Sequence, residues 1–226
     1  DTTTADSSLS STQYTSIVQN QEGLNLQHLN WGTSNAKPLT VSFHVRSNVT
    51  GTYCLLMVAK DATVKYQSQT YTIDSANTWE KKTITYPGDT SGAFGNDNGA
   101  SLELNLWLAS GSNNTSGTLQ TNWASQVSAN RAVGQVNLAD STSNEWYITG
   151  VQLEAGEVAS DFEFLPVDVN LARCQRYFEK MLPETMIMLR YSGSTSFGRA
   201  GNFKVTKRAS PSLSRENGTT TIGAYN

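Results

Sequence analysis

The sequence predicts an all-β protein: an antiparallel β-sandwich followed by a short helix and a small β segment. Three observations predict this class. Short apolar–polar alternations recur along the first 166 residues with turn signals between them. No helical pattern precedes residue 167. The composition is 37% hydrophobic, only 15% charged, and rich in Ser, Thr, Asn and Gly, which is typical of strands and turns with a neutral polar surface.

The first part of the chain contains several strand patterns. Residues 12–29 predict a strand pair that bends at Glu22 and Gly23. Residues 52–60 are apolar throughout, which predicts a central strand. Residues 39–46 alternate cleanly, so that their inward side is expected to hold Val41, Phe43 and Val45, and their outward side Ser42, His44 and Arg46.

The later strands follow the same logic. Residues 62–73 alternate weakly, a strand opens at Trp79, and Pro87 ends it. The strongest strand carries Leu102, Leu104, Leu106 and Leu108 on one face and Glu103, Asn105 and Trp107 on the other. A last strand over 145–154 is expected to turn Tyr147, Thr149, Val151 and Leu153 to one side and Trp146, Ile148, Gln152 and Glu154 to the other. Together with the apolar pattern at residues 133–138, these segments predict about eight to ten short strands.

Two further segments are distinctive. Residues 110–126 form a Gly/Ser/Asn-rich loop around Trp123, long enough to suggest a functional role. After Pro166, Asp168 is placed to cap a helix over 168–181. Its apolar stripe would hold Leu171, Cys174, Phe178 and Met181, and short strands are expected at 185–191, 202–206 and 219–225.

Charge changes sign at the same point. Residues 1–166 carry 7 Lys and Arg against 15 Asp and Glu, and residues 167–226 carry 9 against 4. We therefore predict two domains, 1–166 and 167–226, that attract each other or neighbouring subunits. The basic charges are too dispersed to favour nucleic-acid binding. No apolar run approaches the roughly 20 residues of a membrane helix, the first residues lack a signal-peptide pattern, and the start at Asp1 looks internal.

The two cysteines lie far apart in the sequence. Cys54 belongs to an apolar strand and Cys174 to the apolar stripe of the helix. Such thiols are more often buried separately than bridged, so we expect no disulfide. Free thiols fit assembly in a reducing cytoplasm.

Several segments, in the same order along most of the chain, resemble a module of bacteriophage tail-fibre and other virion proteins. They are residues 22–23 (EG), 31–32 (WG), 36–38 (AKP), 41–47 (VSFHVRS), 77–80 (NTWE), 87–90 (PGDT), 147–156 (YITGVQLEAG), 162–163 (FE), 171–178 (LARCQRYF) and 203–209 (FKVTKRA). The resemblance implies a carbohydrate-binding-module-like jelly roll in a virion protein that is assembled in the host cytoplasm. The family usually has Trp where this chain has His44.

No constellation of residues predicts an enzyme or a cofactor site. The two histidines, His28 and His44, lie outside any nucleophile motif. Glu103 and Glu154 could share a sheet face, as a glycosidase would need, but solvated strand residues are the simpler interpretation. No Cys/His cluster has zinc spacing. Sandwiches of this kind often hold a structural calcium, to which Glu22 and Glu154 could contribute oxygens, and this question stays open.

Binding is the better-supported function. Sugars are recognised by an aromatic face together with amide, carboxylate or guanidinium groups. The predicted outward positions offer such groups at His44, Arg46, Glu103, Asn105, Trp107, Trp146 and Gln152. The alternative for Trp107 or Trp146 is that the indole packs beneath a loop.

The resemblance and these residues together predict a non-enzymatic phage virion component, part of a tail fibre, that recognises a bacterial surface glycan. The alternative is a structural or decorating module whose aromatic face packs on other virion subunits. A glycan-degrading enzyme is the third, weakest hypothesis. Because three strands and a helix make a thin core, we also predict a homotrimer with residues 168–226 at or near its axis.

Overall fold

The computed structural model describes residues 3–180, 187–190, 197–200 and 202–212. The chain divides into two compact units, Asp1–Phe162 and Glu163–Asn226. The sequence places the boundary slightly later, between Pro166 and Val167.

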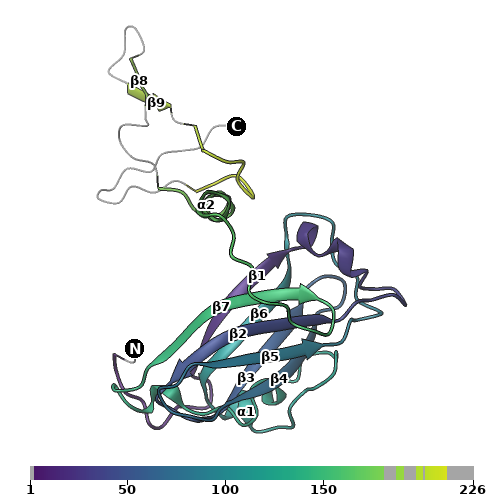
Figure 1. Ribbon diagram of the computed structural model, residues 1–226, viewed down its shortest axis with the longest axis vertical. Coiled ribbons are helices and arrows are strands. Elements are labelled where there is room, and N and C mark those ends of the chain that lie inside the picture. The colour runs from purple at the N-terminus through teal and green to yellow at the C-terminus, as the bar shows by residue number, and fades with distance from the viewer. Residues whose placement is uncertain (1–2, 181–186, 191–196, 201, 213–226) are drawn as a thin grey trace. The chain divides into compact units, whose positions relative to one another are not determined.

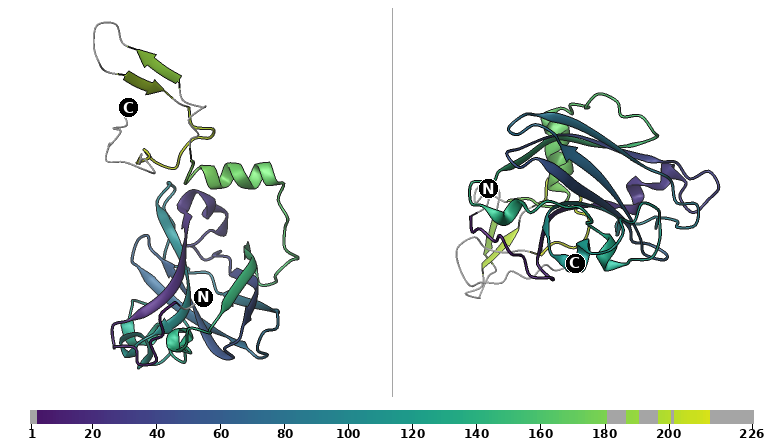
Figure 2. Two further views of the ribbon diagram at one scale, coloured as in Figure 1. Left: turned by 90° about the vertical axis from the view of Figure 1, so that its left-hand side faces the viewer. Right: turned by 90° about the horizontal axis from the view of Figure 1, so that it is seen from below.

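The first unit is a sandwich of two antiparallel sheets (Figures 1 and 2). One sheet has the strand order β1 (Tyr14–Glu22), β6 (Ala100–Ser110), β3 (Gly51–Ala59), β4 (Lys65–Ile73). The other has the order β5 (Glu80–Tyr86), β2 (Leu39–Ser47), β7 (Trp146–Ala155). In Figure 1 the three-stranded sheet lies in front of the four-stranded one. The predicted all-β sandwich is therefore confirmed.

The main core lies between the two sheets. Val41, Phe43 and Val45 of β2 are buried, as the alternation predicts. Opposite them, Leu102, Leu104 and Leu106 of β6 belong to the same cluster. Both strands bury one face because the side-chain period of a strand is two.

Strand β3 lies between β4 and β6, which confirms that it is central. Its alternate residues serve two cores. Tyr53, Leu55 and Met57 join the main cluster, whereas Cys54, Leu56 and Val58 join a smaller cluster on the outer side of the sheet. The second cluster also contains Trp107 and Ala132, with Leu119 packed against it. Burial on both faces explains the uninterrupted apolar run of β3.

The loops differ from the expectation in two places. Residues after Glu22 form two short 3-10 turns, Gly23–Asn25 and Gln27–Leu29, and not the second strand of a pair. Residues 133–138 contain no strand and lead into a 3-10 turn, Leu138–Asp140. The long loop after β6 contains a single helical turn, α1 (Ser112–Thr115), and a 3-10 turn, Ser128–Asn130.

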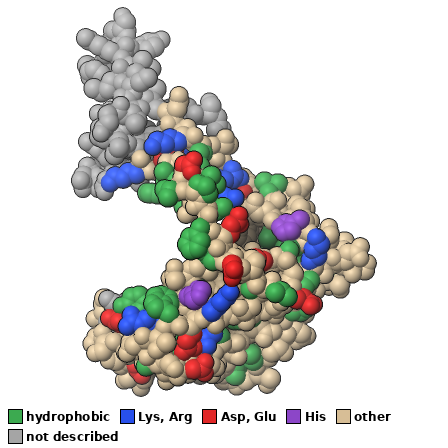
Figure 3. Space-filling model, in the orientation of Figure 1, with side chains coloured by type: hydrophobic (Ala, Val, Ile, Leu, Met, Phe, Trp, Pro, Cys, Tyr) green, Lys and Arg blue, Asp and Glu red, His purple; other side chains and the backbone are tan. Residues whose placement is uncertain are grey.

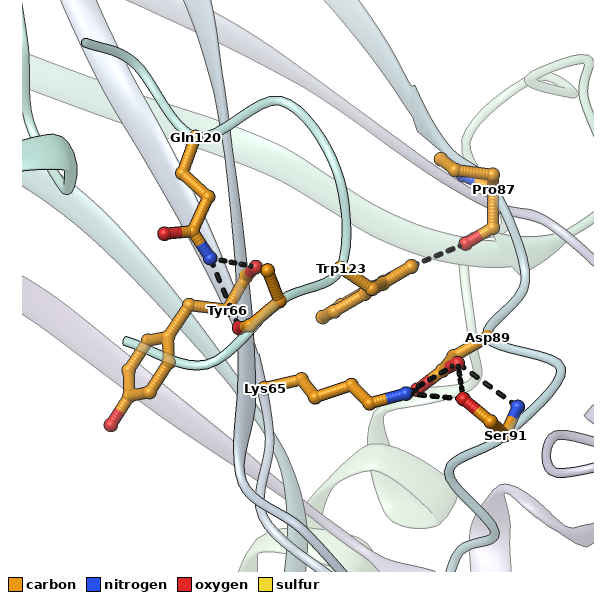
Figure 4. A network of polar contacts seen from close by, with 8 residues as sticks. Lys65, Tyr66, Pro87, Asp89, Ser91, Gln120 and Trp123 are labelled. Carbon is orange, nitrogen blue, oxygen red and sulfur yellow. Dashed lines mark hydrogen bonds and ion pairs between the residues drawn. The ribbon is translucent and has the colours of Figure 1, made fainter. Parts of the chain in front are cut away.

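A polar network fastens two loops to β4 (Figure 4). The Nζ atom of Lys65 lies 2.8 and 2.6 Å from the two carboxylate oxygens of Asp89 and donates to the Ser91 hydroxyl at 2.6 Å. The backbone N–H of Ser91 donates to the same carboxylate at 3.0 Å. Nearby, the indole N–H of Trp123 donates to the carbonyl of Pro87 at 2.7 Å. The Asp89 side chain is only 5% exposed, so this ion pair is largely shielded from water.

The cysteines are both free, and their environments differ. Cys54 is buried as expected, its thiol donates to the carbonyl of Val133 at 3.4 Å, and burial raises its pKa to about 12. Cys174 is exposed, which contradicts the expectation of a second buried thiol. The apolar stripe on which it lies is not covered within the described part of this chain.

The second unit contains helix α2 (Val167–Gln175) and a hairpin of β8 (Ile187–Arg190) and β9 (Phe197–Ala200). The helix is shorter than expected, and Asp168 lies in its first turn while Pro166 is the N-cap. Residues 202–206 form no strand, and the strand expected at 219–225 and Met181 lie outside the described residues. The Lys207 ammonium pairs with the Glu179 carboxylate at 2.6 Å. Among the described residues, no helix has the length and apolarity needed to cross a membrane.

Candidate functional site

The outer face of the four-stranded sheet is covered where Trp107 lies. This indole is 1% exposed and packs against Leu119 and Ala132 of the loop that follows β6. The guanidinium of Arg131 lies over its ring at 5.1 Å. Trp107 is thus a core residue beneath a loop, and its prediction as a ligand-binding residue on an open face is wrong.

Glu103 and Asn105, on the same face of β6, are engaged with neighbours. The Glu103 carboxylate pairs with Lys60 at 2.6 Å and accepts from the Asn105 amide at 2.6 Å. Partial burial raises the pKa of Glu103, but hydrogen bonds from Lys60 and Asn105 outweigh it, so that the net shift is downward. Asn105 is buried. These contacts give both residues a structural role in holding β6 and its neighbours.

The seven predicted site residues are divided among three environments. Glu103, Asn105 and Trp107 belong to the four-stranded sheet. His44, Arg46 and Gln152 belong to the outer face of the three-stranded sheet, and Trp146 packs against the main core. Glu103 and Glu154 likewise lie on different sheets, so they do not share a face.

A bulge in β7 explains the position of Trp146. Gly150 has φ +60, and the pairing of β2 with β7 shifts register between Ser42 and His44. An extra residue in a strand reverses the alternation beyond it. Before the bulge Trp146 turns inward, whereas after it Gln152 turns outward. The sequence pattern treated the strand as regular and therefore placed both on one face.

The segment after β7 folds back over one half of the outer face of the three-stranded sheet. The Ser160 hydroxyl donates to the Glu154 carboxylate at 2.5 Å and accepts from the Gln152 amide at 3.1 Å. The Thr40 hydroxyl donates to the carbonyl of Gly156 at 2.7 Å. The side chain of Phe162 lies close to Gly150. The Gln152 amide is therefore already hydrogen-bonded within its own chain.

The other half of this face is open, and we call it the Arg46 platform. The pairings of β2 with β5 and β7 bring its central residues into one surface. Figure 3 shows basic, histidine and apolar side chains gathered on this side of the sandwich. The platform consists of His44, Arg46, Trp79, Lys81, Tyr147 and Thr149.

Arg46 is the centre of the platform. Its guanidinium lies 5.5 Å from the ring centroid of Tyr147, and its Nε donates to the carbonyl of Asn77 at 2.9 Å. Within the described part of the chain, its terminal nitrogens have no hydrogen-bond partner. Tyr147 is 38% exposed and Trp79, just before β5, is 48% exposed. The arrangement presents fixed N–H donors beside the accessible aromatic ring of Tyr147.

The platform holds two cations, Arg46 and Lys81, and the Glu145 carboxylate lies beside Tyr147. A hydrogen bond with the Glu145 carboxylate raises the pKa of Tyr147, so the phenol stays neutral near pH 7. Arg46 and Lys81 supply charged donors, and His44 and Thr149 supply further polar groups. Such a surface can stack on a sugar ring and donate to its hydroxyl, carboxylate or phosphate oxygens.

Sequence reasoning found two members of the platform, His44 and Arg46, and missed the other four, Trp79, Lys81, Tyr147 and Thr149. A regular alternation that turns Trp146 outward places Tyr147 on the opposite face, away from the predicted site. A glycine inside a strand pattern is a signal for a bulge, and Gly150 supplied that signal.

Within the described residues, no group of three or more His, Cys, Asp and Glu side chains could hold a metal ion. The carboxylate of Glu154 is hydrogen-bonded to Ser160, and Glu22 lies at the end of β1 opposite Ala100. No protein-family model, curated protein or solved structure matches this chain.

Proposed function

We propose that the chain is a non-enzymatic component of a bacteriophage tail fibre, whose sandwich is a carbohydrate-binding-module-like jelly roll that recognises a glycan on the bacterial surface. The segments that resemble phage virion modules support the virion assignment. The open Arg46 platform supports binding. The observation that carries the binding proposal is the Arg46 guanidinium held over Tyr147 with its terminal nitrogens turned to no described residue.

The platform suits a glycan for physical reasons. An aromatic ring contacts the C–H face of a sugar, and a guanidinium donates paired hydrogen bonds to adjacent oxygens. Arg46 is held at its Nε by Asn77 and at its plane by Tyr147, so little side-chain entropy is lost on binding. The covered half of the sheet, beneath residues 157–162, would border the ligand and not contact it.

The experiment is a glycan array probed with the full chain and two variants. We expect Arg46→Ala and Tyr147→Ala each to weaken binding to the recognised glycan by about tenfold or more, since a charged hydrogen bond or a stacked ring contributes about 1–3 kcal/mol. Both residues lie on the surface, so the melting temperature should change little.

Lys37→Ala is the matched control, because Lys37 is an exposed cation outside the platform. It should leave glycan binding unchanged. Equal binding by wild type and both platform variants would contradict the proposal. A chain that binds no glycan but binds an isolated virion subunit through the platform would favour the structural or decorating module.

For assembly we propose a homotrimer with residues 168–226 at or near its axis. The exposed apolar side chains of the second unit support it. Val167, Leu171 and Phe178 are more than half exposed, and no residue of α2 is buried. An exposed apolar stripe of this kind marks an interaction surface.

Light scattering on the full chain tests this assembly. We expect a mass three times that of the 24.6 kDa chain. Leu171→Ser combined with Phe178→Ser should shift the mass toward the monomer, because each change removes apolar surface from the contact. Asn170→Ser, a polar change on the same helix, should not. A wild-type chain that stays monomeric at high concentration would rule the trimer out.

A further inference from the structure

A hollow lies on the four-stranded sheet, whereas the Arg46 platform lies on the three-stranded sheet. It is a depression of about 480 Å³ that is open to solvent. Its lining comes from the segment before β1, from β1 itself, from α1 and from the 3-10 turn at 128–130. The lining residues are Thr12, Tyr14, Asn113, Asn114, Ser116, Ser128 and Ala129, none of which is charged at pH 7.

The walls of the hollow are fixed by backbone hydrogen bonds. The N–H of Asn113 donates to the carbonyl of Ser11 at 2.9 Å, and that of Gly117 donates to the carbonyl of Ala129 at 2.9 Å. The N–H of Ala132 donates to the carbonyl of Asn114 at 2.8 Å. These bonds join three segments that are distant in the sequence. Because the walls are held in the free protein, a ligand would not have to order them.

Tyr14 forms an aromatic wall. Its ring centroid lies 5.3 Å from that of Trp107, which is buried in the outer cluster of the same sheet and supports the ring on the protein side. The Tyr14 side chain is nevertheless 58% exposed. An aromatic ring that is supported on the protein side and open toward solvent is suited to stack on another flat or C–H-rich surface.

The polar groups around Tyr14 divide into anchored and available ones. The Asn114 amide is buried and donates to the Ser110 hydroxyl at 3.1 Å. Within the described part of the chain, the side chains of Thr12, Asn113 and Ser116 make no hydrogen bond to one another or to neighbours and are open to solvent or partly so. Hydroxyl and amide groups both donate and accept, as sugar hydroxyls do.

We propose that this hollow binds a neutral saccharide residue, with the Tyr14 ring against its C–H face and Asn113, Thr12 and Ser116 meeting its hydroxyls. The absence of charge from the lining selects against ionic ligands, because neither an anion nor a cation would find a partner of opposite sign there. The site rests on different residues from the Arg46 platform and does not depend on the function proposed for that surface.

The test is a titration of the full chain with neutral mono- and disaccharides at millimolar concentration, followed by amide chemical shifts. We expect saturable shifts at Tyr14 and Asn113 for at least one sugar. Tyr14→Leu, which keeps apolar cover over Trp107, and Asn113→Ala should each weaken that binding by about fivefold or more.

Val64→Ala serves as the matched control, since Val64 is an exposed apolar residue outside both the hollow and the Arg46 platform. It should leave the saccharide affinity at the hollow unchanged. Shifts at the hollow that persist equally in Tyr14→Leu and Asn113→Ala would overturn the assignment, as would the lack of shifts there with every sugar. Failure of the platform variants to affect the glycan array would leave this outcome untouched, so the two proposals fail separately.

Discussion

Trp107→Ala is expected to lower the free energy of unfolding by about 3–5 kcal/mol, the cost of truncating a large buried aromatic residue. The indole is 1% exposed, packs with Leu119 and Ala132, and lies beneath Arg131. Its loss would open a cavity between β6 and the loop that covers it, and would remove one of the two rings over which the Arg131 guanidinium lies. Urea unfolding followed by circular dichroism measures the change, and the melting temperature should fall by about 10 °C.

Trp79→Ala is the matched control, because Trp79 is 48% exposed at the edge of the platform. Its effect on stability should stay within about 0.5 kcal/mol, as for most surface substitutions. If Trp107→Ala kept the wild-type transition and lost only ligand binding, the buried position of Trp107 would be contradicted. Trp107 would then be an accessible ligand-binding residue, as the sequence predicts.

Asp89→Ala is expected to cost about 3 kcal/mol of stability, because removal of one partner of a buried pair leaves the other charge without compensation. Lys65 would lose both carboxylate contacts, and the Ser91 N–H would lose its acceptor (Figure 4). Because Lys65 is partly exposed, the expected loss of stability lies at the lower end of the range for broken buried ion pairs. The exposed carboxylate of Asp74, which contacts Lys82 at 3.2 Å, provides the control: Asp74→Ala should cost less than about 1 kcal/mol.

The stability that Asp89 contributes depends on pH in a defined direction. Burial alone would raise the pKa of its carboxyl group, but hydrogen bonds from Lys65 and Ser91 outweigh it and the pKa is lowered. A group with a lowered pKa in the folded state stabilises the fold above its unfolded pKa and loses this effect as the pH falls through its folded value. The difference in free energy of unfolding between wild type and Asp89→Ala should therefore become smaller below about pH 4. A constant difference down to pH 2 would contradict the ion pair.

Much of the sandwich could be predicted because its signals are local. Val41, Phe43 and Val45 alternate with polar residues, and each is buried in the structure. The apolar run at 52–60 gave the central strand for the same reason. The segment after Glu22 was predicted wrongly, because Leu26 and Leu29 are apolar and buried but reach the core from 3-10 turns and not from a strand.

The candidate site was harder to predict because it depends on contacts between distant segments. Alternation places Trp107 outward from the main core, and this is correct, but it does not reveal that Leu119 and Ala132 cover it. The same alternation fails across Gly150, where one extra residue exchanges the faces of β7. Arg46 was identified correctly, whereas its partner Tyr147 required the register of β2 with β7.

The most direct test of the central claim is a map of amide chemical shifts in the full chain, recorded with and without the glycan identified on the array. The Arg46 platform predicts that the largest changes occur at His44, Arg46 and Tyr147, with a change in the Trp79 indole signal. Saturable binding of that glycan with no change at these four residues would contradict the platform as its site.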